Sequence, residues 1–377
     1  MSRLDELIAE LCPDGVEFVE LNEVLDYEQP TKYIVKSTNY DDSYTIPVLT
    51  AGQSFVLGYT NEDFGIYKAS PDSPVIIFDD FTTSFHWVDF NFKVKSSAMK
   101  MLRSKDNEIA NLRFLFHLMK NINYIPVDHS RQWIGKYSKF RIPLPPLPVQ
   151  QEIVRILDNF TELTAELTTE LTAELTARRK QYEYYRDFLL TFGDEVEWTT
   201  LGEVAINLDS KRKPVAKGKR KAGEYPYYGA SGIVDYVDDY IFDGDYLLVS
   251  EDGANLVARV TPIAFSASGK IWVNNHAHVL EFETYEDRKF IEYYLNMIDL
   301  SRFLSTAAQP KLTQENLNKI PVPAPSFEEK ERIVAILDRF DALCNDLTSG
   351  IPAEIEARQK QYEYYRDKLL SFKEVTA

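Results

Sequence analysis

The chain contains one octapeptide twice, and this repeat restricts its fold more than any other feature of the sequence. KQYEYYRD occupies residues 180–187 and recurs at 360–367, so the two copies start 180 positions apart. The segments IVRILDNF at 153–160 and IVAILDRF at 333–340 keep the same separation. Self-similarity of this length in a constant register indicates two copies of one structural unit.

The two copies match unevenly along their length. The helical segments are nearly identical, whereas residues 25–141 and 205–319 share little beyond a faint outline. Segments that match are expected to meet similar partners, and segments that differ are expected to meet different targets. The pattern therefore favours one scaffold that presents two different recognition domains. The alternative is an old duplication in which only the packing of the helices was retained.

Length and composition set broad limits on the fold. A chain of 377 residues can form two or three domains, each with its own core. Hydrophobic residues make up 44% and charged residues 27%, which is typical of a globular protein. No apolar run is long enough to cross a bilayer, and the acidic N-terminal segment lacks the pattern of a signal peptide. We therefore expect a cytoplasmic protein in which Cys12 and Cys344 are buried thiols without a disulfide or metal role.

The sequence predicts an α+β fold, in which two mixed α/β recognition domains are separated by two long helical segments that form an antiparallel coiled coil. Proline-rich stretches at 142–148 and 320–325 are expected to stop strands and helices just before each long helix. The N-terminal helix is expected to complete the unit that the C-terminus leaves unfinished, which brings the two ends together in a pseudo-two-fold arrangement. The predicted domains are an N-terminal helix at 1–15, a first recognition domain at 16–146, a central helical spacer at 147–195, a second recognition domain at 196–325 and a C-terminal helical spacer at 326–377.

Four tandem tetrads of the form xELT cover residues 161–176 of the central helix. Their leucines recur every four residues and are expected to form an apolar stripe that drifts slowly round the helix and needs a partner helix. The positions 180 residues later are also apolar, so the two segments are expected to pair, although SGIP at 349–352 should break the second helix. A pair of ordinary core helices is the alternative. The spacer residues are Leu163, Leu167, Leu171 and Leu175, and their counterparts are Leu343, Leu347, Ile351 and Ile355.

Basic residues are concentrated in one stretch of the second domain. The net charge of −17 argues against a chain that binds nucleic acid over its whole surface, but residues 210–222 hold seven Lys and Arg residues without an acid. Basic residues neutralise phosphates, and the tyrosines that follow can stack on bases. A solvated charge run is the alternative. The candidate DNA-binding residues here are Lys211, Arg212, Lys213, Lys217, Lys219, Arg220, Lys221, Tyr227 and Tyr228.

Basic residues are sparser in the first domain. Lys93 and Lys95 alternate along a predicted strand and are therefore expected to share one face of it. Arg131 and Gln132 are candidates for base reading, because Arg pairs with guanine and Gln with adenine in the major groove. Each residue taken singly is better explained as a plain surface residue, and only the set indicates binding.

Signatures of catalysis are absent from the sequence. There is no G-x-G-x-x-G, Walker A or H-E-x-x-H motif, and the histidines show no metal-ligand spacing with cysteine. The His-x-His at 276–278 is better explained as a structural pair than as a metal site. The acidic pairs at 79–80 and 251–252 could act as catalytic carboxylates, but turns at strand ends explain them equally well. We therefore expect a chain that is not catalytic by itself and has no metal site.

Taken together, these features resemble the specificity subunit of bacterial type I restriction-modification enzymes. The resemblance rests on two variable recognition domains, helices that end in QYEYYRD, IPxPxP joints before the long helices, and the stretch YPYYGASGIVDYVDDYIFDGDYLLVSEDG at 225–253. The xELT tetrads are similar to short tandem repeats in the central helix of some family members. The resemblance covers essentially the whole chain.

The resemblance implies a bipartite double-stranded DNA target, with one half read by each domain and the half-site spacing set by the scaffold. It also implies two methyltransferase subunits that dock on the scaffold, and motor-nuclease subunits in the full complex. S-adenosylmethionine, ATP and Mg are then expected on those partners, and no cofactor is expected on this chain. The break at 349–352 departs from strict two-fold symmetry. The residues expected to form the docking scaffold are Tyr182, Tyr185, Leu189, Tyr362, Tyr365 and Leu369.

Two other classes of protein remain as alternatives. A coiled-coil interaction protein could use its two β-rich domains to bind proteins or glycans, and the negative net charge favours this class mildly. A self-contained nuclease or methyltransferase would need a nucleotide or metal motif, which the sequence lacks. DNA binding that tightens as the salt concentration falls would separate the first class from a specificity subunit.

Overall fold

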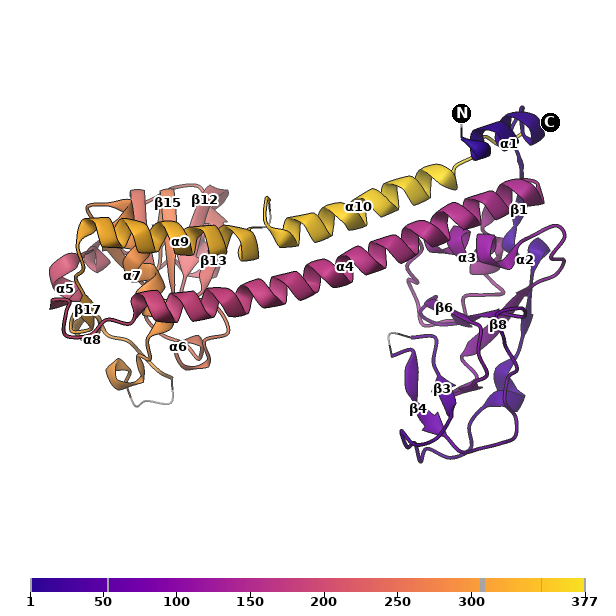
Figure 1. The fold of residues 1–377 in the computed structure, drawn as a ribbon, viewed down its shortest axis with the longest axis horizontal. Coiled ribbons are helices and arrows are strands. Elements are labelled where there is room, and N and C mark those ends of the chain that lie inside the picture. Colours follow the sequence, from indigo (N-terminus) through magenta and orange to yellow (C-terminus); the bar gives the residue numbers. More distant parts are fainter. Residues whose placement is uncertain (1, 53, 306–308, 347, 376–377) are drawn as a thin grey trace. The chain divides into compact units, whose positions relative to one another are not determined.

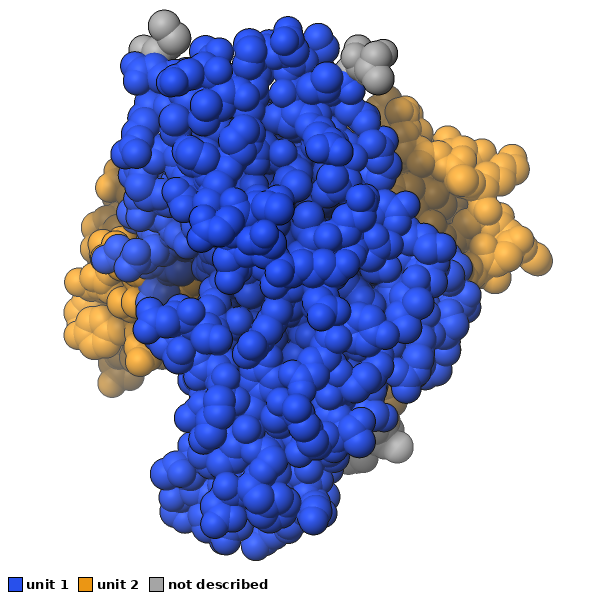
Figure 2. Space-filling model, turned by 90° about the vertical axis from the view of Figure 1, so that its right-hand side faces the viewer, with its two compact units in different colours: residues 1–169, 356–377 blue, residues 170–355 orange. Residues whose placement is uncertain are grey.

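The computed structural model describes residues 2–52, 54–305, 309–346 and 348–375. It consists of two units, which Figure 2 shows in blue and orange. Unit 1 comprises Met1–Thr169 and Glu356–Ala377, and unit 2 comprises Glu170–Ile355. The long helices α4 (Leu147–Leu190) and α10 (Ile351–Leu369) each have residues in both units, so each unit contains helical segments from both sequence repeats (Figure 1).

Unit 1 consists of short strands with few helices before α4. In chain order its elements are α1 (Arg3–Leu11), β1 (Glu17–Glu20), α2 (Leu21–Val24), β2 (Leu25–Glu28), η1 (Pro30–Tyr33), β3 (Ile46–Leu49), β4 (Val56–Thr60), β5 (Val75–Asp79), β6 (Phe85–Val88), β7 (Lys93–Val94), β8 (Met99–Ser104), α3 (Leu112–Asn121), η2 (Tyr137–Lys139) and β9 (Arg141–Leu144).

The core of unit 1 lies on both faces of a four-stranded sheet with the order β2-β8-β5-β6. On the central strand β5, Ile76 and Phe78 pack with helix α3, whereas Val75 and Ile77 pack with a second sheet of order β4-β3-β7. A strand that is covered on both faces is expected to be apolar at every position, and β5 begins with the run VIIF. The sequence of β5 therefore determines its place at the centre.

Unit 2 contains longer strands. In chain order its elements are β10 (Trp198–Thr200), α5 (Leu201–Val204), β11 (Ile206–Asn207), η3 (Asp209–Lys211), η4 (Lys217–Lys219), β12 (Ala222–Gly229), β13 (Gly232–Val237), β14 (Phe242–Ser250), α6 (Asn255–Ala258), β15 (Ala264–Val273), β16 (Ala277–Glu281), α7 (Tyr285–Met297), η5 (Ser301–Phe303), α8 (Gln314–Asn318), β17 (Pro321–Pro323) and α9 (Phe327–Asn345).

The two units repeat one strand topology. The order β2-β8-β5-β6 of unit 1 corresponds to β11-β16-β14-β15 of unit 2, and β4-β3-β7 corresponds to β13-β12-β15. The strand pairs β3-β7 and β12-β15 are both parallel, whereas their neighbours are antiparallel. In unit 2, the single long strand β15 joins both parts into one six-stranded sheet. The expectation of two recognition domains with one architecture is confirmed.

Each proline-rich stretch contains the end of a short strand, β9 to Leu144 and β17 to Pro323, and the strand stops there before the next helix begins, as expected. β9, which contains Pro143, pairs with β1 in a two-stranded ribbon, and β17, with Pro321 and Pro323, pairs with β10 in another. Every strand of a two-stranded ribbon is an edge strand, so a proline without an N–H group can face away from its partner. Each ribbon leads the chain into its long helix.

The long helices form an antiparallel pair within each unit, and the two pairs use equivalent residues. In unit 1, Phe160 of α4 lies against Tyr365 of α10, with ring centroids 5.9 Å apart. In unit 2, Phe340 of α9 lies against Tyr185 of α4, with centroids 5.6 Å apart. Positions 160 and 340, like 185 and 365, are 180 residues apart, so the same contact is made twice. This confirms the coiled-coil scaffold with a pseudo-two-fold internal repeat.

The leucines of the tetrads do not form the buried stripe that the sequence predicted. Leu163 is 51% exposed, and Leu167, Leu171 and Leu175 are only partly buried. In unit 1 the groove between α4 and α10 is lined on the α4 side by threonines and an alanine of the tetrads, at 161, 164, 165 and 168. Four residues turn a helix by about 400°, so a strict four-residue repeat drifts by about 40° per tetrad and cannot keep one column facing a partner.

The predicted helix break is confirmed between α9 and α10. α9 ends at Asn345 and α10 begins at Ile351. At Gly350 a Cβ atom would lie 2.6 Å from the carbonyl oxygen of Ala342, so the tight turn requires glycine. Of the predicted partner positions, Leu343 is partly exposed, Ile351 is buried, Ile355 is partly buried and Leu347 lies outside the described residues.

None of the helices in the described ranges is long and apolar enough to span a membrane.

The two ends of the chain meet within unit 1, as the repeat predicted (Figure 1). The N–H group of Val16 donates to the carbonyl oxygen of Lys373 at 2.9 Å, and the N–H group of Val375 donates to Val16 at 3.1 Å. Leu4 of α1 and Leu370 belong to the same hydrophobic cluster. The N-terminal segment therefore completes the unit to which the C-terminal helix belongs.

Candidate nucleic-acid interface

The basic stretch of unit 2 is an ordered loop that is fixed at both ends by its arginines. Arg212 donates to the carboxylate of Glu251 at 2.6 Å and to the carbonyl oxygen of Ala277 at 2.7 Å, and it is largely buried. Arg220 donates to Asp235 at 3.0 Å and lies 4.3 Å above the ring of Tyr227. These arginines hold the loop on the sheet, so their assignment as DNA contacts is corrected to a structural role.

Both tyrosines after the loop belong to the framework of unit 2. Tyr227 is buried, and its hydroxyl accepts a hydrogen bond of 2.9 Å from the N–H group of Val215. Tyr228 is partly buried and stacks on Phe265, with ring centroids 6.1 Å apart. The prediction that these rings stack on bases is therefore wrong for Tyr227, and Tyr228 has its main contacts inside the unit.

The remaining basic residues of the loop are exposed and form the basic patch of unit 2. Their backbone is held by the two arginines and by Trp272, whose indole N–H donates to the carbonyl oxygen of Lys213 at 2.6 Å. Because the backbone of this loop is already fixed, little conformational entropy is lost when its exposed ammonium groups bind the phosphates of DNA. The basic patch consists of Lys211, Lys213, Lys217, Lys219 and Lys221.

Two of the four candidates in unit 1 are buried in local networks, and a third is partly buried. Lys93 is completely buried and pairs with Glu62 at 2.9 Å, which excludes it as a DNA contact. Gln132 is also completely buried, and its amide donates to the carbonyl oxygen of Ser130 at 2.7 Å. Lys95 is partly buried and donates to the hydroxyl group of Tyr40. Lys93 and Gln132 are therefore corrected to structural residues.

Arg131 is the exposed candidate of unit 1, and a buried carboxylate holds it. Its guanidinium lies 3.2 Å from Asp80, and its side chain remains 52% exposed. Asp80 is buried and also pairs with the buried Lys100 at 3.2 Å, and it accepts the N–H group of Trp133 at 2.8 Å. The neighbouring Asp79 accepts backbone N–H groups in the turn after β5, which explains it without catalysis.

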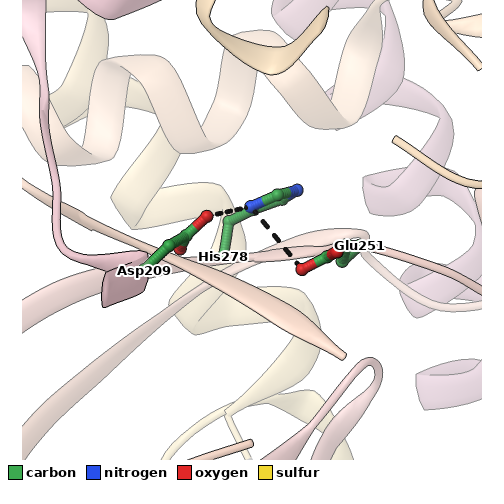
Figure 3. A group of neighbouring side chains, drawn as sticks. All are labelled: Asp209, Glu251 and His278. Carbon is green, nitrogen blue, oxygen red and sulfur yellow. Dashed lines mark hydrogen bonds and ion pairs between the residues drawn. The ribbon is translucent and has the colours of Figure 1, made fainter. Parts of the chain in front are cut away.

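Unit 2 contains a denser network of buried charges, with Asp209, Glu251 and His278 at its centre (Figure 3). The Nδ1 atom of His278 lies 2.6 Å from Asp209, and its Nε2 atom lies 2.8 Å from the carbonyl oxygen of Leu312. Glu251 binds Arg212 on one oxygen and Lys311 on the other, the latter at 3.0 Å. Both ring nitrogens and both Glu251 oxygens are thus engaged, which describes an ion-pair network rather than a set of free metal ligands.

The stability of unit 2 is expected to decrease on acidification because of this network. Burial raises the pKa of Asp209 and Glu251, but hydrogen bonds from His278, Arg212 and Lys311 outweigh it and hold both pKa values below the ordinary 3.8 and 4.5. A carboxylate with a lowered folded-state pKa stabilises the fold above its unfolded pKa and loses that contribution as the pH falls through the folded value. Urea unfolding should therefore occur at lower urea concentration below about pH 4.5.

The matched variant for this prediction is Glu251→Gln. It should be less stable than the parent protein at pH 7 but should lose less stability between pH 7 and pH 3.5, because one titrating group is gone. Hydrogen exchange of residues 242–281 reports on unit 2 alone. Equal pH dependence in both proteins would show that Glu251 is not a source of the effect.

The sequence of the chain matches a known protein family twice. The family model described as "Type I restriction modification DNA specificity domain" matches residues 13–177 and again residues 193–357. The two matches start 180 positions apart, which is the period of the internal repeat, and together they span most of the chain. The chain belongs to this family.

One relative in the DNA specificity family matches the chain over nearly its whole length, and another matches half of it. A type I restriction enzyme specificity subunit of Escherichia coli is 43% identical over 407 aligned residues, which cover 99% of this chain and 97% of the relative. A putative type I restriction enzyme specificity subunit of Haemophilus influenzae is 39% identical over half of each chain.

Solved structures show the same fold at low sequence identity. The S subunit of a type I restriction-modification system from M. genitalium has a TM-score of 0.54 at 16% identity, covering 94% of this chain and 96% of that one. A chain from a structural study of assembly and conformational transition in the type I R-M system has a TM-score of 0.61 at 18% identity, covering 96% and 98%. At these identities the likeness concerns the fold alone.

In this member of the DNA specificity family, the residues expected to form a docking face mainly build the helix pairs. Tyr182 and Tyr185 contact Phe340, and Leu189 is buried in the core of unit 2, so Leu189 is corrected to a core residue. In unit 1, Tyr362 and Tyr365 contact α4 and Leu369 packs on the core. The most exposed aromatic residues of the same segments are Tyr184, Phe188 and Tyr364, which the sequence did not single out.

Proposed function

We propose that this chain is the DNA specificity subunit of a type I restriction-modification enzyme. Each unit reads one half of a bipartite DNA site, and the helical scaffold docks two methyltransferase subunits and sets the spacing between the half-sites. The observation that carries the proposal is the combination of a repeated scaffold with unrepeated surfaces. The contact between Phe160 and Tyr365 recurs as Phe340 with Tyr185, whereas the basic patch of unit 2 has no counterpart among the described residues of unit 1.

The repeated scaffold supports docking of two copies of one partner. Tyr184 and Tyr364 are 180 positions apart and both exposed, so each copy of the scaffold has the same exposed aromatic side chain at the same position. Exposed aromatic residues are enriched in protein interfaces because they bury a large area with few rotatable bonds. Phe188 has Lys368 as its counterpart, so the two docking surfaces are similar but not identical.

The chemistry of modification and cleavage is proposed to lie on partner subunits. The buried carboxylates Asp80 and Glu251 are each held by two cations, and neither is free to act as a general base. S-adenosylmethionine is proposed to bind the methyltransferase subunits, and ATP with Mg the motor-nuclease subunits. This chain supplies sequence recognition without catalysis and without a cofactor of its own.

The proposal is tested by long-read methylation sequencing of a host that expresses this chain with its methyltransferase subunit. We expect a split motif with one modified adenine in each half. A single undivided motif would mean that only one unit reads DNA. A complex that assembles but adds no methylation would contradict the proposal and would favour an interaction protein.

The basic patch gives a prediction about DNA affinity. The triple variant Lys217→Ala, Lys219→Ala, Lys221→Ala is expected to weaken binding to all sequences, because each lysine that meets a phosphate releases counterions. The slope of log K against log salt should fall by about one for each phosphate contact removed. The measurement is DNA binding by the reconstituted complex at several salt concentrations.

The control for the basic patch is Arg220→Ala. Arg220 is held by Asp235 and the ring of Tyr227, so its loss should loosen the loop without removing a direct phosphate contact. We therefore expect a smaller change in salt slope than in the triple variant. An unchanged slope in the triple variant would mean that the patch does not lie on the DNA backbone.

A further inference from the structure

A buried carboxylate directly follows β5, the central strand of unit 1. The backbone of the same residue makes a further hydrogen bond at this end of the sheet. The N–H group of Asp80 donates to the carbonyl oxygen of Ala98 at 2.8 Å, just beyond the paired part of β8. The carbonyl oxygen of Asp80 accepts the N–H group of Gln132 at 2.8 Å, which attaches the segment between α3 and η2 to the strand end. Asp80 therefore fixes a loop through its backbone as well as through its side chain.

The same arrangement recurs in unit 2 around Glu251, which follows the equivalent central strand β14. Its N–H group donates to the carbonyl oxygen of His276 at 2.9 Å, just before β16, and its carbonyl oxygen accepts the N–H group of Leu312 at 2.8 Å. Both backbone bonds match those of Asp80, and strands β5 and β14 hold the same place in the shared topology. The two carboxylates are therefore structural equivalents, although one is an aspartate and the other a glutamate.

Each carboxylate holds one exposed cation at an equivalent position. Arg131 immediately precedes Gln132 and lies 3.2 Å from Asp80, and Lys311 immediately precedes Leu312 and lies 3.0 Å from Glu251. The Arg131 side chain is 52% exposed and the Lys311 side chain is 48% exposed. The two positions are 180 residues apart, in the register of the internal repeat. Lys311 was not among the candidates, although this register would have indicated it.

The loop after Asp80 carries backbone strain at Thr83. Among the described residues, the non-glycine residues with positive φ are Thr83, at 60°, and Arg259, at 51°. Thr83 lies in the loop after β5, whereas Arg259 is the C-cap of α6, where a left-handed residue commonly ends a helix. A left-handed conformation costs energy for any residue with a Cβ atom, and most for a β-branched one. Strain of this kind persists mainly where a loop must hold a functional shape.

The surroundings of the two cations differ. In unit 1 the guanidinium of Arg131 lies 5.8 Å from the ring of Phe81, which stacks on His129. In unit 2 the neighbouring groups are the exposed His276 and its partner Asp252, 2.8 Å apart. Each unit thus has a cationic side chain at the same position, but the groups around it differ. This is the arrangement expected of two domains that bind DNA in the same way and read different bases.

We propose that Arg131 and Lys311 are equivalent DNA contacts, each held by its buried carboxylate against the half-site that its own unit reads. This inference rests on the proposed function and adds to it the residues that meet each half-site. An exposed cation that is already oriented by a carboxylate loses little side-chain entropy on binding. The remaining N–H groups of either side chain can donate to a phosphate or to a base edge in the major groove.

The experiment uses the complex of this chain with its methyltransferase subunits and duplexes in which the sequence of one half-site at a time is scrambled. Arg131→Ala is expected to weaken binding to the intact site by about tenfold. The same variant should match the parent complex once the half-site of unit 1 is scrambled. Lys311→Ala should show the reverse pattern, with its effect abolished by scrambling the half-site of unit 2. A structural defect that affects both units would not follow the identity of the half-site, and hydrogen exchange of residues 75–104 and 242–281 detects a defect confined to one unit.

Matched controls are Lys105→Ala in unit 1 and Lys319→Ala in unit 2, which remove exposed cations away from the two carboxylates. Arg131→Gln and Lys311→Gln provide second variants that keep a hydrogen-bond donor for the carboxylate while removing the charge. Binding of both cation variants within about twofold of the controls would overturn this inference. If the parent complex binds no bipartite site at all, the proposed function fails instead, so the two failures are distinct.

Discussion

Replacing Asp80 by alanine is expected to lower the free energy of unfolding of unit 1 by roughly 3–5 kcal/mol. Asp80 and Lys100 are both buried and lie 3.2 Å apart, so removing the carboxylate leaves an ammonium group without its partner inside the protein. The N–H group of Trp133 also loses its acceptor. The large loss of stability arises because the ammonium group of Lys100 remains buried without a counter-charge. The attraction between Asp80 and Lys100 contributes little to stability by itself.

Hydrogen exchange measures this effect in unit 1 separately from unit 2. Peptides from 75–104 and 128–140 should lose protection in Asp80→Ala, while peptides from 242–281 serve as the internal reference. The matched control is Asp79→Ala, which removes a neighbouring carboxylate that only accepts turn N–H groups. Combining Asp80→Ala with Lys100→Met should restore part of the loss, because no buried charge then remains. Equal effects in Asp79→Ala and Asp80→Ala would contradict this account.

Deleting residues 169–172, one complete tetrad of α4, is expected to shorten the DNA spacer between the half-sites by one or two base pairs. Four residues of α-helix span about 6 Å. Two base pairs at about 3.4 Å each span nearly the same distance. The deletion leaves every residue of both recognition domains in place, so both half-site sequences should stay unchanged.

Methylation sequencing of a host with the deletion variant measures the spacer directly. The matched control is Thr169→Ala, which converts TELT into AELT, the form of the neighbouring tetrads, at constant helix length. Its spacer should equal that of the parent protein. An unchanged spacer in the deletion variant, with methylation intact, would rule out α4 as the element that sets the distance. A change in the half-site bases would instead indicate that the deletion disturbs a recognition domain.

Part of the architecture could be predicted because the sequence repeats. Two segments with the same residues must make the same contacts, so the period of 180 predicted the paired helices and the meeting of the two chain ends. Single residues with strict backbone requirements were equally informative, as Gly350 shows at the helix break. The repeat did not reveal which of its side chains are exposed: Tyr184 is exposed, whereas Leu189, which was expected on the docking face, is buried.

Local sequence patterns did not predict which basic residues are exposed, because this depends on ion-pair partners from distant segments. The basic residues Lys93, Arg212 and Arg220 were indistinguishable in sequence from Lys217 or Lys219, yet each is paired with a carboxylate and withdrawn from the surface. Arg212 has one partner three residues away, Asp209, but its pair with Glu251, the pair of Arg220 with Asp235 and the pair of Lys93 with Glu62 join residues 15 to 39 positions apart. The prediction for the tetrads was wrong for another reason: the drift expected from a four-residue repeat on a helix of 3.6 residues per turn is large enough to leave their leucines exposed or only partly buried.

By itself, then, the sequence determined the two-fold repeat, the α+β class, the long helices and the place where the second one breaks. These features follow from residues that are identical, periodic or conformationally restricted, and such properties are local to the chain. Only the tertiary structure decided which cations remain exposed, and that Asp80 and Glu251 hold Arg131 and Lys311 at equivalent positions. Burial and ion pairing depend on the distance between segments far apart in sequence, and that distance is set when the strands of each sheet come together.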